Sequence, residues 1–200
     1  MSNSNAALDN LDREILEKRR ERLKEAHRNL ESGIYLHGDI ITFERRGFLD
    51  LFSLMLPTTF NEMSEELKHV KYTSKFSPIV TLTNEDLSVN LGFNMFTDHT
   101  SRSPITGMAG VIKETLESKQ STFDFQDITP LKDVDGCYFQ FYQTTFDIDV
   151  FHVMAFVRIN DQIVQATFNC LSDLDLVTWQ TTVVQMLETI KKYEKEKGDY

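Results

Sequence analysis

The clearest pattern in this sequence is an alternation of apolar and polar residues between Leu87 and Met95. Apolar side chains occupy every second position there, which is the period of a β-strand with one buried face. Other strand-like runs occur at 40–44, 49–56, 79–83, 123–129, 136–146, 148–159 and 163–170. Turn-forming residues between these runs are Arg45-Arg46-Gly47, Asn84-Glu85-Asp86 and Asn160-Asp161. We therefore expect several hairpins.

A helix is predicted over residues 9–31, where seven basic and seven acidic side chains occur at helical spacing. Glu14 and Lys18, for example, are one helical turn apart. Three leucines repeat at intervals of seven: Leu16, Leu23 and Leu30. Arg19 and Arg20 interrupt this stripe, so two interpretations stay open. The segment is a dimerising or partner-binding helix, or a solvated helix that lies on its own domain.

Three further helices are predicted from capping residues and apolar spacing. A capping box at Thr59 and Glu62 indicates a short helix ending near residue 70. Its expected inward residues are Met63, Leu67 and Val70. Pro104 opens a helix to about residue 119. A second capping box, Ser172 with Asp175, precedes a helix to about residue 193 that carries Trp179.

Strands cluster along the chain instead of alternating strictly with helices. This order predicts an α+β fold, an antiparallel β-sheet covered by helices, preceded by a charged N-terminal α-helix. We expect a helical extension over 1–33, a single α+β domain over 34–195 and a disordered tail over 196–200.

Aromatic and apolar residues occur on both faces of the strands expected between 136 and 159. Such strands are covered on both sides, or else one face is an open apolar surface. In the first case helices of the same chain cover both faces. In the second, a groove binds a hydrophobic helix or peptide of a partner. The residues of that expected groove are Tyr138, Tyr142, His152 and Met154.

Composition narrows the classes of partner. The 200 residues carry a net charge of −10, which disfavours nucleic acid as a ligand of the main body. No apolar run approaches the roughly 20 residues that span a bilayer, and the first residues lack the pattern of a secretory signal peptide. We expect no membrane insertion and a cytoplasmic location. Cys137 and Cys170 fall in apolar runs and are expected to be buried thiols.

Candidate chemistry is sparse. The five histidines form no H-x-x-H pattern and the two cysteines no C-x-x-C pattern, so we expect no metal site. No glycine-rich phosphate loop indicates a cofactor. The most enzyme-like cluster precedes the helix that begins near Pro104, where backbone N–H groups and a histidine suit an anion. Its residues are His99, Ser101, Arg102 and Ser103.

The order of elements resembles the superfamily that contains the plant PsbP proteins, the bacterial DcrB lipoproteins and a Ran-binding nuclear import factor. The matching features are the strand LFSLMLP ending at Pro57, the short polar helix, the strand LSVNLGFNMF, the helix after Pro104, and strands closing in the helix with Trp179. The resemblance covers residues 40–193. The chain differs by the absence of a lipobox cysteine near its start and by the helix over 9–31. The resemblance implies a non-enzymatic binding or adaptor module, and one similar branch consists of toxin chaperones.

We therefore expect a non-enzymatic, cytoplasmic protein-binding module, an adaptor or a chaperone-like protein, with a protein partner or client. An acidic protein suits basic or amphipathic clients. Two alternatives stay open. One is a small-molecule or anion-binding protein or hydrolase centred on residues 98–103, and the other is a structural protein that forms a homodimer through its N-terminal helix.

Overall fold

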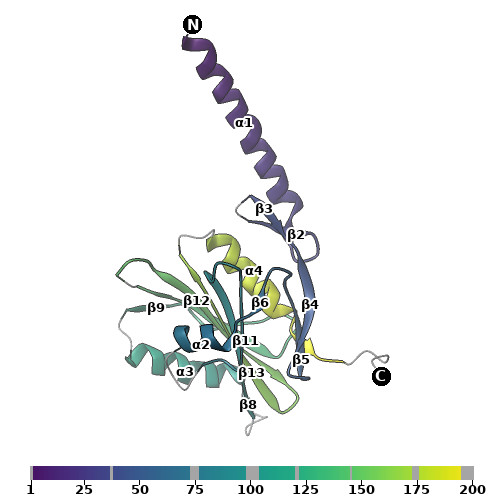
Figure 1. Ribbon diagram of the computed structural model, residues 1–200. Helices are drawn as coiled ribbons and strands as arrows, with labels where there is room; N and C mark the ends of the chain where they lie inside the picture. Colours follow the sequence, from purple (N-terminus) through teal and green to yellow (C-terminus); the bar gives the residue numbers. More distant parts are fainter. Residues whose placement is uncertain are drawn as a thin grey trace.

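The computed structural model describes residues 2–36, 38–72, 77–97, 104–119, 122–144, 146–172 and 176–194, with side chains described from residue 13 onward. Figure 1 shows a body built around a large twisted β-sheet, from which one long helix projects.

The large sheet has eight strands, all paired antiparallel, in the order β10-β11-β12-β13-β8-β7-β6, with β9 also pairing with β11. Its strands are β6 (Asn61–Glu62), β7 (Val80–Thr83), β8 (Val89–Thr97), β9 (Phe123–Phe125), β10 (Thr129–Pro130), β11 (Gly136–Gln143), β12 (Val150–Ile159) and β13 (Gln162–Leu171). Asn160 has a positive φ of 57° in the turn between β12 and β13. The predicted α+β class is confirmed.

Helices cover the two faces of this sheet. On one face α3 (Ile105–Lys119) packs on β11 and β12, and Ile105 shares a cluster with Phe139. On the other face α4 (Leu176–Glu188) packs on β12, β13 and β5, and Trp179 belongs to the cluster that contains Phe151. Aromatic residues stand on both faces of β11 and β12 because each face has its own hydrophobic core.

A second sheet has the order β14-β5-β4, with β4 (Phe43–Phe48), β5 (Phe52–Pro57) and β14 (Lys191–Lys192). The predicted turn at Arg45-Arg46-Gly47 is wrong, because these residues lie inside β4. The chain turns at Leu49 and Asp50, whose φ values are 56° and 52°, and Leu51 N donates to Phe48 O. Gly47 serves close packing instead, since a Cβ there would collide with the ring of Tyr193.

Two of the predicted helices begin or end at other residues in the structure than the sequence predicted. The short helix α2 (Glu65–Lys71) is capped by Ser64 and not by Thr59, because the chain at residues 61–62 pairs with β7 as a strand. Of its expected inward residues only Met63 is buried, whereas Leu67 and Val70 are exposed. The last helix ends at Glu188, after which residues 191–192 pair with β5. In the predicted capping box before it, Asp175 lies outside the described residues.

The N-terminal helix α1 (Ser2–Ala26) ends before the predicted residue 31. After it, β1 (Arg28–Asn29), β2 (Gly33–Leu36) and β3 (Asp39–Ile41) form a small antiparallel sheet. Leu30 is buried in the turn between β1 and β2, Leu23 is half-buried, and Leu16 is exposed. The three leucines therefore do not form one helical seam. The expected ion pair between Glu14 and Lys18 is present at 2.7 Å.

Candidate functional site

The four residues expected to form a partner-binding groove do not share a surface. In the register of β11 and β12, Tyr138 pairs with Ala155 and Tyr142 with Phe151, on the face covered by α4. His152 and Met154 pair instead with Phe141 and Phe139 on the face covered by α3. Directly paired residues share a face. Alternation along a strand shows which of its own residues share a face. Only the register between β11 and β12 shows which residues of one strand lie on the same face as those of the other.

These four side chains are also engaged inside the molecule. Tyr142 accepts a hydrogen bond from Gln180 Nε2 at 2.6 Å, and Tyr138 packs against the core on the α4 face. The His152 ring stacks on Phe141 with centroids 4.6 Å apart, and burial lowers the pKa of His152 to about 4. This imidazole is neutral at pH 7. The expected anion site, comprising His99, Ser101, Arg102 and Ser103, lies outside the described residues.

A groove that the sequence did not reveal lies at the base of α1. It has a volume of about 840 Å³ and runs between β3, the loop after β5 and the turn between β7 and β8. Apolar side chains line its inner part, and they are nearly inaccessible to solvent. They are Leu36, Phe60, Val89 and Trp179. Around them stand three exposed carboxylates, Asp39, Glu85 and Asp86. The groove therefore combines an apolar floor with an acidic rim.

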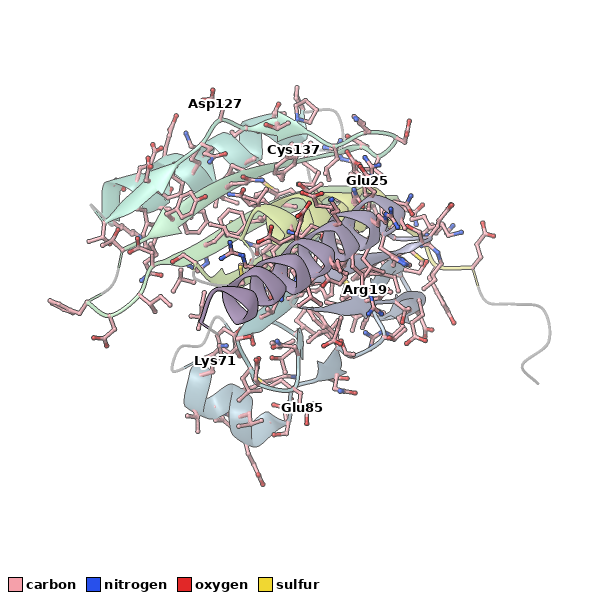
Figure 2. All side chains as sticks on the ribbon, turned by 90° about the horizontal axis from the view of Figure 1, so that it is seen from above. Arg19, Glu25, Lys71, Glu85, Asp127 and Cys137 are labelled. Atoms are coloured by element: carbon pink, nitrogen blue, oxygen red, sulfur yellow. The ribbon has the colours of Figure 1, made fainter. Side chains whose placement is uncertain are left out.

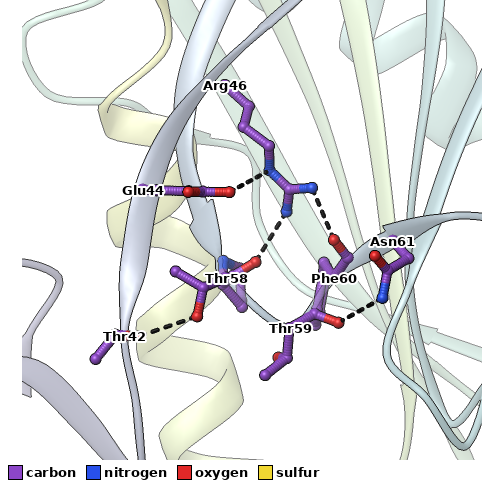
Figure 3. Close-up of polar contacts among 8 residues, drawn as sticks. Thr42, Glu44, Arg46, Thr58, Thr59, Phe60 and Asn61 are labelled. Atoms are coloured by element: carbon purple, nitrogen blue, oxygen red, sulfur yellow. Dashed lines mark hydrogen bonds and ion pairs between the residues drawn. The ribbon is translucent and has the colours of Figure 1, made fainter.

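The first wall, the loop after β5, is held by the guanidinium of Arg46 (Figure 3). Arg46 donates from Nη1 to Phe60 O at 2.7 Å and from Nη2 to Pro57 O at 2.8 Å. Its Nε lies 3.6 Å from Glu44 Oε1, an ion-pair distance too long for a hydrogen bond. The planar fork of arginine suits two carbonyls at once. Phe60 is thereby positioned beside Trp179, with ring centroids 6.1 Å apart.

The second wall is the turn over residues 84–88, which its own side chains rigidify. Asn84 Oδ1 accepts from Val89 N at 2.9 Å, and Asp86 Oδ1 accepts from both the hydroxyl and the backbone N–H of Ser88. These hydrogen bonds lower the pKa of Asp86, the hydroxyl contributing most, so the carboxylate is charged at neutral pH. Lys71 Nζ donates to Leu87 O from outside the groove lining.

The third wall is the edge of β3 with the residue that follows it. Asp39, Ile40, Ile41 and Thr42 all line the groove, and the Ile40 side chain is 42% exposed. Thr42 joins the first wall, because Thr58 N donates to Thr42 O at 2.9 Å and the two hydroxyls lie 2.9 Å apart (Figure 3). Figure 2 places Glu85 on the opposite side of the molecule from Cys137 and Asp127. The acidic rim is therefore remote from α3.

Two observations describe the metal-binding and thiol groups in the described part of the chain. No group of three or more His, Cys, Asp or Glu side chains there is arranged to hold a metal ion. Cys137 and Cys170 are buried and form no disulfide, and burial raises the pKa of Cys137 to about 11, which leaves a protonated thiol. Among the described helices none is long and apolar enough to cross a bilayer.

A smaller pocket of about 560 Å³ lies over β8 and β13 on the α3 side of the sheet, with Met154, Gln165 and Asn169 in its lining. Asn169 Oδ1 accepts from Asn90 Nδ2 at 3.2 Å. Asn90 Oδ1 and Thr81 Oγ1 are buried without a hydrogen-bond partner among the described residues. Like the groove at the base of α1, this pocket has a mixed lining of apolar and polar side chains.

No protein-family model and no curated protein matches this chain. Among solved structures, cyanobacterial PsbP (CyanoP) from Synechocystis sp. PCC 6803 is similar with a TM-score of 0.53 at 10% identity, covering 80% of this chain and 98% of that protein. LpqN of Mycobacterium tuberculosis, described as involved in cell envelope biogenesis, has a TM-score of 0.47 at 12% identity, covering 79% of this chain and 88% of its own.

The similarity to CyanoP concerns the fold alone, because the identity is 10%. The chain has a PsbP-like α+β fold, in agreement with the resemblance predicted from its order of elements. The long helix α1 projects from that body (Figure 1).

Proposed function

We propose that this chain is a non-enzymatic, cytoplasmic protein-binding module, an adaptor or chaperone-like protein, that holds a segment of its partner in the groove at the base of α1. The observation that carries the proposal is the apolar floor with Phe60 and Trp179 beneath a rim of three carboxylates. Ile40, which is 42% exposed beside this floor, offers apolar surface that a partner removes from water. A charged rim selects partners of opposite charge.

Features elsewhere in the chain support a binding role. The buried thiol of Cys137 is protonated and His152 is neutral, so neither is prepared for nucleophilic or acid–base chemistry at pH 7. Two buried cysteines that form no disulfide suit a reducing compartment. The cytoplasmic part of the proposal is tested by fractionating the native cells and locating the protein with an antibody.

Site-specific crosslinking tests the binding site. A photo-reactive amino acid replaces Thr59, which is exposed in the groove wall, in the full chain expressed in its native cell. The matched control places the same group at Asp127, which is exposed on the far side (Figure 2). We expect a discrete covalent adduct from position 59 alone, with the partner segment identified by mass spectrometry. Equal labelling from both positions, or none from either, contradicts the proposal.

The pocket over β8 and β13 favours a second candidate function, the binding of a small, uncharged molecule with polar groups. Its lining contains three side-chain amides, from Asn94, Gln165 and Asn169, which can donate to such a molecule and accept from it. A thermal-shift screen with small amides and sugars tests this function. Any stabilisation that survives the substitution Asn169→Leu argues against this pocket as its source.

A further inference from the structure

The edge of β3 that faces the groove has free hydrogen-bonding groups. In the ladder between β2 and β3, Tyr35 pairs with Ile40, between the pairs Ile34 with Ile41 and Leu36 with Asp39. Tyr35 N donates to His27 O at 3.3 Å, so this N–H points away from β3. In an antiparallel ladder, hydrogen-bonded and non-hydrogen-bonded pairs alternate. Tyr35 and Ile40 therefore form a non-hydrogen-bonded pair.

It follows that the N–H and C=O of Ile40 point outward from β2, and among the described strands none pairs with β3 on that side. Consecutive residues of a strand project to opposite faces. The groove is nevertheless lined by three consecutive residues of β3, Asp39, Ile40 and Ile41. A single face of the strand could not present all three, so the strand presents its edge to the groove. The groove therefore has one donor and one acceptor of the main chain on its wall, above the apolar floor.

We infer that the groove binds an extended partner segment, with apolar residues on one face and lysine or arginine on the other, which adds as a strand to the free edge of β3. This inference rests on the proposed function and specifies the chemistry of the partner. One residue of the segment exchanges both backbone hydrogen bonds with Ile40, as in other cases of strand addition. The bonds to Thr58 occupy the end of the edge at Thr42, so the paired stretch is short.

Side chains of the added strand alternate between two environments. Those on one face lie against the exposed side chain of Ile40, at the margin of the buried floor that Phe60 and Trp179 form. Those on the other face reach the rim, where Asp39, Glu85 and Asp86 supply negative charge and the described lining contains no basic side chain. An alternating apolar and basic sequence satisfies both environments at once. An acidic segment is repelled, and a uniformly apolar one leaves the carboxylates without partners.

Peptide binding to the full chain tests this inference. The probe is a ten-residue peptide of alternating valine and lysine, titrated by calorimetry and by the fluorescence of Trp179, the only tryptophan in the chain. Two derivatives are N-methylated, one at the valines and the other at the lysines, so that each loses the donors along one edge of the strand. We expect one derivative to bind at least about tenfold more weakly and the other to keep its affinity.

Substitutions in the chain give matched controls. Ile40→Pro removes the outward N–H and is expected to weaken binding about tenfold, whereas Ile40→Val leaves the backbone donor in place. Glu85→Gln is expected to weaken binding about two- to fivefold at low salt, whereas Asp127→Asn on the far side has no effect. Thermal unfolding of each variant confirms that the body is folded.

Equal affinities for both methylated peptides and the parent would overturn strand addition. Absence of binding at about 1 mM peptide would overturn the partner chemistry. A dimer that light scattering detects in the parent and that Ile40→Pro disrupts would show a second copy of the chain on the edge, and would also overturn the inference. In each case, a crosslinked adduct specific to position 59 leaves the proposed function standing, so the two failures are distinguishable.

Discussion

The substitution Arg46→Met tests how the groove wall is held. The arginine lies within β4 and donates to Pro57 O at the end of β5 and to Phe60 O in the loop that follows. Methionine keeps an apolar stem of similar length but provides no donor. The substitution therefore removes both hydrogen bonds while preserving most of the packing of the side chain.

The expected loss of stability follows from these contacts. A hydrogen bond to a charged group contributes about 1.5–3 kcal/mol. The Arg46 side chain is 25% exposed, so water partly replaces the lost donors. We expect Arg46→Met to lower the free energy of unfolding by about 3 kcal/mol, and Arg46→Lys by about half as much, because an ammonium group does not reproduce the bidentate geometry.

Urea unfolding followed by tryptophan fluorescence measures these differences, since Trp179 is 3% exposed and lies beside Phe60. Glu44→Gln is the matched control, because Glu44 is 55% exposed and 3.6 Å from the guanidinium. It is expected to cost less than about 0.5 kcal/mol. If Arg46→Met cost no more than Glu44→Gln, the reasoning would be refuted, and packing of Phe60 alone would hold the loop.

Three further predictions concern the body of the protein. His152 has a folded pKa of about 4, below its ordinary value of 6.5, so the unfolded chain binds the proton first as the pH falls. About 3 kcal/mol of the free energy of unfolding is therefore lost between pH 6.5 and 4. The substitution His152→Phe is expected to remove this part of the pH dependence, measured by urea unfolding. If the free energy of unfolding of the variant fell with pH as steeply as that of the parent, His152 would not be its source. Leu49 has a φ of 56° in the turn of the hairpin, and Leu49→Asn is expected to raise the free energy of unfolding by about 0.5–1 kcal/mol, whereas a lower midpoint in urea would argue against backbone strain there. The Cys137 thiol, with its raised pKa, is expected to react with a thiol reagent only at the rate of unfolding, and a reaction that accelerates from pH 7 to 9 without unfolding would show access to the folded site.

Much of the fold was predictable from local patterns. The alternating run in β8 and the strands β11, β12 and β13 occur where period-two spacing placed them, because a strand buried in a sheet must present apolar residues at that period. Helix α3 begins after Pro104, and Trp179 lies in a helix as predicted, where it is buried. Helix ends were less predictable, since residues 61–62 and 191–192 are drawn into strands by partners distant in the sequence.

The expected partner groove shows the limit of such patterns. Neighbouring residues of a strand point to opposite faces, so Tyr142 and Phe141 lie on different faces of β11. Which residues of β12 share a face with Tyr142 depends on the register between the two strands. The leucine stripe failed for a similar reason, because Leu30 belongs to a turn buried by the body and not to α1.

By itself, the sequence determined the α+β class, the charged helix and an acidic molecule with strands that are apolar on both faces, because these depend on periodicity and composition. The tertiary structure alone decided where a partner could bind. The groove brings together Asp39, Glu85 and Trp179 from three segments that are far apart along the chain. Arg46 was expected in a turn, yet its guanidinium holds one wall of that groove. The groove forms only when segments that are far apart in the sequence pack together. No local pattern of residues indicates that these segments are close in space.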